Sequence, residues 1–215
     1  MENDVSRVVI NGWFYQLRFL IYLVVIAWVV AVINFGLLGK ALNRLGLAPR
    51  TLTGIPGILI SPFLHVDWQH LEGNTVFYFI FGGLVFLREP SDFGAITGAI
   101  AVISGVVLWL VGRPGIYVGA SDVIFGYIGF LLSFAYFDRN LSSVLVLIIT
   151  VMLVVFTQRF GHTLWLVMPI RQGMAWDGHL IGLLTGILVA RHLPILKGWF
   201  DQLIDSLNRL GSSLM

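Results

Sequence analysis

The chain has 215 residues, of which 58% are hydrophobic and only 11% are charged, and its formal net charge is +2. A soluble domain carries roughly 25% charged residues, so this composition indicates a polytopic membrane protein. The chain has no basic patch, and therefore gives no reason to expect nucleic acid as a partner. It also has no cysteine, which excludes disulfides, thiolate metal ligands and a cysteine nucleophile.

Six apolar segments are each about long enough to cross the hydrocarbon core, which requires about 20 residues with a range near 17 to 25. In chain order they cover residues 19–38, 71–87, 93–111, 121–137, 141–156 and 178–192. The first segment is too long for a signal peptide and lacks a small-residue cleavage site, so we expect it to be retained. The sequence therefore predicts an all-α membrane protein, built as a compact bundle of six transmembrane helices.

Three parts follow from this arrangement. We expect residues 1–18 to form an N-terminal interfacial or cytoplasmic segment, 19–192 the membrane domain, and 193–215 an amphipathic tail. In the tail, apolar residues such as Trp199 and Leu203 recur at helical spacing, which is typical of a helix on the membrane surface. A flexible tail is the alternative.

Helix parity places four polar side chains near one surface. The 13 Lys and Arg residues divide 7 to 6 between the two sides, too evenly for the positive-inside rule to decide orientation. The second, fourth and sixth spans nevertheless enter the membrane from the same face. His70 and Asn74 begin the second span, Ser121 begins the fourth and His179 begins the sixth. Because a helix rises only ~1.5 Å per residue, all four side chains should lie at similar depth.

Ser121 is a candidate nucleophile, and His179 is the candidate general base that a serine hydroxyl needs at neutral pH. Such a pair requires close approach of the fourth and sixth spans. The sixth span carries glycines at every fourth position: Gly178, Gly182 and Gly186. Stripes of this kind let membrane helices pack closely, which would bring the imidazole to the hydroxyl. The ordinary alternatives are a serine that caps its helix and a histidine that bonds a neighbouring helix.

His70 and Asn74 are four residues apart and therefore share one helix face. Both can donate hydrogen bonds to the negative charge that develops on a substrate oxygen during acyl transfer. Bonds that merely hold two helices together are the alternative. His65 precedes the regular helix, and we expect it to hold the first loop. Asp177 is expected to cap the last span.

A metal site is the weaker interpretation of the same residues. His65, Asp67, His70 and His179 can be assembled into a zinc site on paper. The spacing that puts two histidines and a glutamate on one helix face is absent. We therefore expect no metal and no other cofactor.

Three stretches resemble the signatures of one family. HVDWQHLEGN (65–74), GASD (119–122) and GHLIGLLTG (178–186) resemble the HxxxxHxxxN, GxSG and AHxxGxxxG patterns of the rhomboid intramembrane serine proteases. The resemblance implies a rhomboid-like bundle with short interfacial helices, both termini in the cytoplasm and a site toward the exterior. It implies the following site residues: Ser121 and His179 as a catalytic dyad, His70 and Asn74 with the Ser121 amide as the oxyanion hole, Phe125 packed on the imidazole, and His65, Gly119, Gly178 and Gly182 in support.

The sequence departs from the family pattern at two site positions and in the first loop. Asp122 stands where a glycine usually follows the serine, and Gly178 replaces the usual alanine. The first loop also lacks the Trp-Arg pair common in the family. The carboxylate of Asp122 can bond His179 or crowd the site, and we expect its replacement by glycine to raise turnover modestly.

The resemblance implies an intramembrane serine endopeptidase that cleaves transmembrane segments of other membrane proteins. Its partners would be these substrates and the lipid bilayer, in the plasma membrane of a prokaryote. The sequence identifies neither the substrate nor the oligomeric state. A catalytically impaired relative that binds membrane helices for quality control or trafficking is the alternative. A small-solute transporter is disfavoured, because the polar residues lie near one face and no internal repeat is evident.

Overall fold

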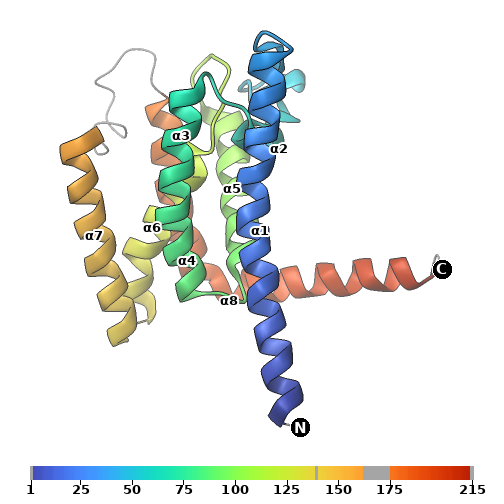
Figure 1. Cartoon of the computed structure of the whole chain (residues 1–215), viewed down its shortest axis with the longest axis vertical. Coiled ribbons are helices and arrows are strands. Elements are labelled where there is room, and N and C mark those ends of the chain that lie inside the picture. The colour runs from blue at the N-terminus through green and yellow to red at the C-terminus, as the bar shows by residue number, and fades with distance from the viewer. Residues whose placement is uncertain (1, 139, 162–174, 214–215) are drawn as a thin grey trace.

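The computed structural model describes residues 2–138, 140–161 and 175–213, whose regular structure is helical (Figure 1). The elements in chain order are α1 (Glu2–Gly36), η1 (Ala41–Leu45), η2 (Leu52–Gly54), α2 (Gly57–Ile60), η3 (Ser61–Phe63), α3 (Trp68–Phe77), η4 (Tyr78–Gly82), α4 (Gly83–Arg88), α5 (Phe93–Val111), α6 (Ser121–Asp138), α7 (Leu141–Gly161) and α8 (Trp176–Ser213). These described residues form no β-strand, although an isolated antiparallel bridge pairs Leu47 with Tyr117.

Over the described residues, five helices are long and apolar enough to cross a membrane. They are Gly12–Gly36, Trp68–Arg88, Phe93–Val111, Ser121–Asp138 and Trp176–Trp199. The second of them joins α3, the π-helical turn η4 and α4 into one span. The chain is therefore a multi-pass integral membrane protein with an all-α fold, as the sequence predicts.

Helix α7 (Leu141–Gly161) corresponds to the remaining predicted span. Its described apolar part, Leu141–Phe156, falls below the 18 residues that the five longer helices reach. The part of the chain that the structure describes thus supplies five candidate spans, with the apolar stretch of α7 beside them.

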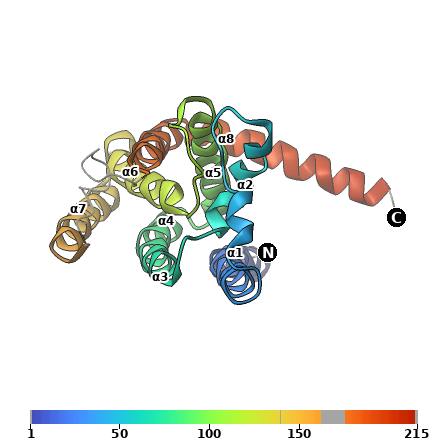
Figure 2. The same cartoon turned by 90° about the horizontal axis from the view of Figure 1, so that it is seen from above.

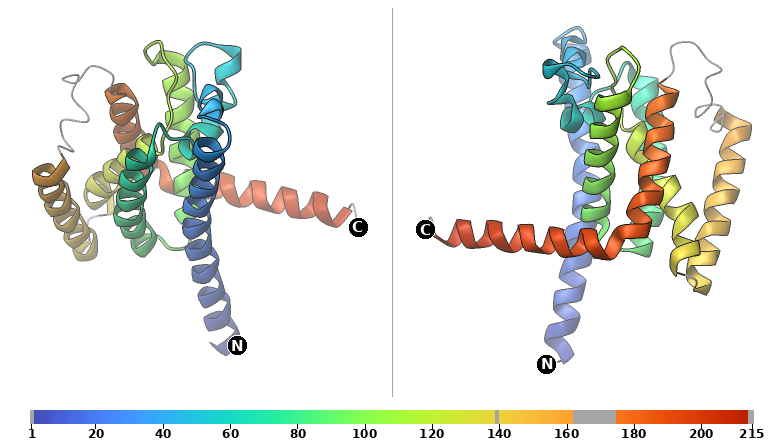
Figure 3. Two further views of the ribbon diagram at one scale, coloured as in Figure 1. Left: turned by 45° about the horizontal axis from the view of Figure 1, so that its top comes forward. Right: turned by 180° about the vertical axis from the view of Figure 1, so that it is seen from behind.

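Both ends of the chain extend the membrane helices. Helix α1 begins at Glu2, so residues 2–18 continue directly into the first span. Helix α8 bends at His192, where φ is −110° and ψ is 16°, two residues before Pro194. Proline lacks an amide hydrogen and clashes with the carbonyl four residues earlier, which explains the bend. Beyond it, α8 turns away and runs across the direction of α1 (Figure 3). An interfacial location for this tail stays a prediction.

Helix α6 lies in the middle of the bundle. Seen from above, it is flanked by α8 and α4, while α7 stands at one outer edge and α1 at the other side (Figure 2). Its apolar side chains supply much of the core, and Tyr127 and Phe130 are fully buried. The hydroxyl of Tyr127 is 2.9 Å from that of Thr97 on α5, which satisfies a polar group that would be costly in an apolar core. The helix that begins at Ser121 is therefore held on several sides.

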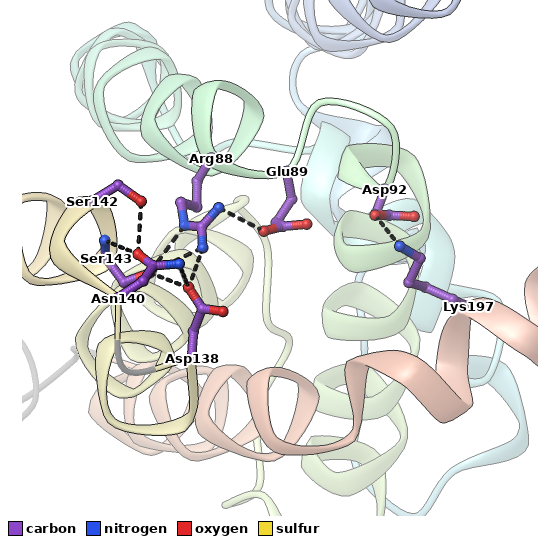
Figure 4. Close-up of polar contacts among 8 residues, drawn as sticks. All are labelled: Arg88, Glu89, Asp92, Asp138, Asn140, Ser142, Ser143 and Lys197. Carbon is purple, nitrogen blue, oxygen red and sulfur yellow. Dashed lines mark hydrogen bonds and ion pairs between the residues drawn. The ribbon is translucent and has the colours of Figure 1, made fainter.

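Polar contacts link the helices at the end of the bundle far from Ser121 (Figure 4). Arg88, at the end of α4, pairs with Asp138 at the end of α6 and with Glu89, 3.1 Å away. It also donates to Ser143 Oγ of α7 at 2.9 Å. These contacts join α4, α6 and α7 at the end of α6 that is far from Ser121.

Candidate active site

The loop between α1 and α3 is folded by side-chain hydrogen bonds that position two histidines. Asn34 Nδ2 donates to Asn43 Oδ1 at 2.9 Å, and Asn43 Nδ2 donates to the carbonyl of His65 at 2.9 Å. Asp67 then caps α3 by accepting the amide of His70 at 2.8 Å. His65 and His70 therefore lie at the amino-terminal end of α3, where the sequence places them.

Ser121 and His179 lie in direct contact. Ser121 begins α6 and His179 lies in the first turn of α8. The Nε2 atom of His179 is 2.9 Å from Ser121 Oγ, a distance suited to a nucleophile and its base. The ring of Phe125 stacks on the imidazole, with centroids 4.6 Å apart and planes at 16°. The aromatic ring thus fixes the orientation of the imidazole.

Glycines allow the short distance between α6 and α8. A Cβ atom added to Gly182 would lie 2.0 Å from the carbonyl oxygen of Asp122, and one added to Gly186 would lie 1.9 Å from that of Gly126. The two backbones therefore touch, which any larger residue would prevent. Gly178 differs from the other two, because a Cβ atom there would make only ordinary contacts, at 3.6 Å or more.

His70, Asn74 and Gly119 form a second polar group beside the dyad. Asn74 Nδ2 lies 3.0 Å from Nε2 of His65 and 3.4 Å from Nε2 of His70. A Cβ atom on Gly119 would lie 2.6 Å from His70 Cε1 and 3.1 Å from Asn74 Nδ2. Gly119 also has a φ of +112°, which favours glycine, and its amide donates to the carbonyl of Ser61 at 2.9 Å. Both the backbone conformation and the close approach require glycine here.

Burial determines the protonation of His65. It lowers the pKa of His65 from 6.5 to about 4, and the neighbouring His70 adds a smaller effect in the same direction. The imidazole of His65 is therefore neutral at pH 7, so that its Nε2 accepts a hydrogen bond from the amide of Asn74. This bond fixes the side chain of Asn74. It also links the first loop to α3, in line with the expectation that His65 holds this loop.

A cavity of about 520 Å³ brings the two polar groups together. Ser121, His179, His70 and Asn74 all contribute to its lining. Most of the remaining wall is apolar, and includes Phe77, Phe81, Ile116, Val118 and Ile128. An apolar cavity with a few convergent polar groups is the usual form of a substrate site. Among the described residues, no group of three or more His, Asp and Glu side chains is arranged to hold a metal ion.

Asp122 is buried beside Ser121, but its side chain faces α5. Its Oδ2 atom accepts a hydrogen bond from Ser104 Oγ at 3.2 Å, and its Oδ1 atom accepts the amide of Val123 at 2.8 Å. Ser104 is fully buried. The carboxyl group that departs from the family pattern therefore joins α6 to α5, and its hydrogen bonds do not run to His179.

The sequence patterns do not indicate a function for Arg113 or Tyr117, and for Asp177 they indicate only a capping role. Asp177 is the second residue of α8, and its carboxylate accepts hydrogen bonds from the amide of Arg113 and the hydroxyl of Tyr117. These partners lie at least 60 positions away in the chain, so no local sequence pattern indicates the contact. The available signal is the placement of Arg113 and Tyr117 in the short loop before α6 and of Asp177 in the first turn of α8.

The fold and the site define a class, that of all-α membrane proteins with a serine–histidine pair at the end of two closely packed helices. Residues 53–194 match the Rhomboid domain, which is well over half of the chain. The chain belongs to the rhomboid family.

Of three individual relatives, one carries a rhomboid name and two are uncharacterized. The chain is 31% identical over 161 residues to an uncharacterized protein of Mycobacterium tuberculosis, covering 71% of this chain and 65% of that protein. It is 34% identical over 143 residues to an uncharacterized protein of Mycobacterium leprae, covering 62% and 54%. It is also 37% identical over 92 residues to the chloroplastic Rhomboid-like protein 11 of Arabidopsis thaliana, covering 40% and 32%. The chain therefore spans less than two thirds of the length of the relatives it matches.

Proposed function

We propose that this protein is an intramembrane serine endopeptidase that cleaves transmembrane segments of other membrane proteins. The observation that carries the proposal is the 2.9 Å contact between Ser121 Oγ and His179 Nε2 at the wall of a large cavity. A serine held by a structural hydrogen bond has no need of such a cavity, of an aromatic ring on its imidazole partner, or of two further donors nearby. These features together favour catalysis over helix capping.

In the proposed reaction, His179 takes the proton of Ser121 as the hydroxyl oxygen attacks the carbonyl carbon of the scissile bond. The substrate oxygen then carries the negative charge of a tetrahedral intermediate. His70, the side-chain amide of Asn74 and the backbone amide of Ser121 stabilise that charge. The intermediate collapses when His179 gives its proton to the leaving amine. A water molecule, deprotonated by the same imidazole, releases the acyl group and restores Ser121.

The substrate class follows from where the dyad lies. Ser121 begins a membrane-spanning helix, so a peptide bond that reaches it must come from a segment near the membrane surface. A helical peptide bond is shielded by its own backbone hydrogen bonds, and a transmembrane substrate must therefore unwind locally before attack. We place the protein in the plasma membrane of a prokaryote, with membrane-protein substrates and the bilayer as its partners.

A catalytically impaired protein that binds membrane helices is the second candidate, and Asp122 is the observation that favours it. A carboxyl group directly after the nucleophile is absent from the family pattern. Its hydrogen bonds run to α5 and to its own helix, which leaves the contact between Ser121 and His179 intact. We therefore favour the active enzyme.

The test uses purified protein, reconstituted with a model transmembrane substrate. Ser121→Ala and His179→Ala should each lower turnover by roughly 10³-fold or more, while thermal stability stays nearly unchanged. The double variant should be no slower than either single variant, because the two residues act as one unit. Gly83→Ala, on α4 with no atoms within 4 Å of the added Cβ, is the control and should keep wild-type turnover. Activity retained in Ser121→Ala would reject the proposal.

A further inference from the structure

The carboxylate of Asp177 collects three hydrogen bonds from a single loop. Its Oδ2 atom accepts the backbone amide of Arg113 at 3.1 Å and the hydroxyl of Tyr117 at 2.6 Å. Its Oδ1 atom accepts Nη2 of Arg113, also at 3.1 Å. The guanidinium group lies over the ring of Trp176, with its carbon 5.0 Å from the ring centroid. We call Arg113, Tyr117, Trp176 and Asp177 the Asp177 clasp.

The clasp joins the two segments that carry the dyad. Arg113 and Tyr117 belong to the loop between α5 and α6, which leads into Ser121, whereas Asp177 lies two residues before His179. Tyr117 and Ala175 both line the cavity that contains the dyad, so the clasp lies at its edge. The start of α8 and the loop above α5 lie at the same end of the bundle (Figure 3).

The loop side of the clasp is itself anchored. The backbone of Tyr117 pairs with that of Leu47 through two hydrogen bonds, of 2.8 and 3.0 Å, and Leu47 is fully buried. Two residues later, the amide of Gly119 donates to the carbonyl of Ser61 at 2.9 Å. The segment that ends at Ser121 is therefore attached at two points to the loop between α1 and α3. Asp177 attaches α8 to this fixed segment.

The register of Asp177 and His179 shows how such an attachment can aim the base. Two residues along a helix correspond to a rotation of about 200°, so the two side chains project to nearly opposite sides of α8. Fixing Asp177 against the loop fixes the rotation of the first helical turn. The imidazole of His179 is then directed to the other side, where Ser121 lies 2.9 Å away.

The donors of the clasp keep their protons near neutral pH. Burial and the hydrogen bond to Asp177 raise the pKa of Tyr117 to about 12. Hydrogen bonds that involve an ionised group are roughly twice as strong as those between neutral groups. The side chain of Asp177 is only 11% exposed, which limits screening by water.

We propose that the Asp177 clasp is a positioning device for catalysis, which sets the rotation of α8 so that His179 meets Ser121. The inference rests on the proposed function, because it assigns Asp177 and Tyr117 an effect on the reactivity of that dyad. It predicts that breaking the clasp slows the chemical step more than it weakens substrate binding. A misplacement of about 1 Å between reacting groups costs on the order of 10²-fold in rate.

The experiment measures kcat and KM for a transmembrane substrate, together with the rate at which a fluorophosphonate labels Ser121. Asp177→Asn should lower kcat and the labelling rate by roughly tenfold or more, with KM nearly unchanged. Tyr117→Phe should give a smaller loss, and the double variant should be no slower than Asp177→Asn, because the hydroxyl acts through the carboxylate. Asp177→Glu, which keeps the carboxylate, should recover part of the lost rate.

The control removes another ion pair of the same helix. Lys197, beyond the bend of α8, pairs with Asp92 at 2.7 Å. Asp92→Asn should leave kcat and the labelling rate unchanged. If Asp177→Asn lowers thermal stability but labels at the wild-type rate when fully folded, the clasp is structural and the inference is rejected.

Hydrogen exchange separates failure of the clasp from failure of the proposed function. A wild-type protein that is not labelled at Ser121 would overturn the proposed function, and with it the catalytic part of this inference. Exchange at residues 176–180 would still test the attachment, since it should be faster in Asp177→Asn than in wild type. Equal exchange rates would show that the clasp does not hold the first turn of α8, which overturns the inference independently.

Discussion

At position 122, a carboxyl group lies inside the membrane domain directly after the proposed nucleophile. Its two hydrogen bonds, to Ser104 Oγ and to the amide of Val123, attach it to α5 and to the start of its own helix. Burying a carboxyl group is costly unless its oxygens are paired, and here both are. Asp122 is therefore part of the contact between α5 and α6. It lies next to the dyad but makes no hydrogen bond to it.

Asp122→Gly should consequently change turnover by only a few-fold, about 1 kcal/mol or less, and we expect a modest rise. The substitution removes a buried carboxyl group and leaves the contact between Ser121 and His179 in place. Turnover of wild type and variant across pH 5 to 9 would measure this. A large loss of activity with a shifted pH profile would instead make Asp122 a working part of the site.

His65 predicts an acid-sensitive stability. Its pKa is about 4 in the folded protein, against 6.5 when unfolded, so between these values the unfolded state binds more protons. The free energy of unfolding should be highest above pH 6.5 and fall as the pH decreases toward 4, by on the order of 3 kcal/mol. Unfolding at fixed temperature from pH 4 to 8 checks this. His65→Gln, which cannot titrate, should flatten the slope; an equal slope in the variant would contradict the assignment.

The pairing of Ser121 with His179 could be predicted from the sequence because it depends on two local patterns. Helix parity gives the depth of the two residues, and glycines at every fourth position give the closeness of the helices. The partners of Asp122 and Asp177 could not be predicted in this way. Ser104 and Arg113 lie 18 and 64 positions from them, and a hydrogen bond between side chains of different elements leaves no periodic trace.

Helices α6 and α8 hold Ser121 and His179 together because the backbones of the two helices are in direct contact. Gly182 and Gly186 press against carbonyl oxygens of α6, at distances that leave no room for a methyl group. The helices can therefore approach until Ser121 and His179 touch. Gly178 lies outside this contact, which is why the family pattern can place an alanine there.

Gly182→Ala should separate α6 from α8 and abolish most turnover. Because its Cβ atom would lie 2.0 Å from a backbone oxygen, relief requires movement of a helix rather than of a side chain. The overpacking should also cost about 1–3 kcal/mol of stability. Turnover and thermal unfolding would be compared with Gly198→Ala, a site on the same helix with open space around it. Equal behaviour of the two variants would show that close packing does not set the dyad distance.

The second span shows why the type of a helix is harder to predict than its position. The residues of η4 form a π-helical turn inside the second span, although YFIFG contains no proline. Such turns arise from tertiary packing and are frequent near functional sites.

In the whole molecule, polar groups lie at both ends of an apolar bundle, and their roles differ between the two ends. At one end, Arg88 joins α4, α6 and α7 (Figure 4). At the other, Asp67 and Asp177 fix the starts of α3 and α8, from which His70 and His179 project into the cavity. The class of the fold is evident from composition and spans, whereas this division between the ends emerges only from the structure.

In the proposed mechanism, Ser121 is a nucleophile activated by His179. The most direct test is to treat the purified protein with a fluorophosphonate and locate the adduct by mass spectrometry. Wild type should carry one adduct, on Ser121; Ser121→Ala should carry none, and His179→Ala should react at least about 10³-fold more slowly. Labelling of Ser121→Ala at the wild-type rate, or an adduct on a different residue, would contradict the assignment.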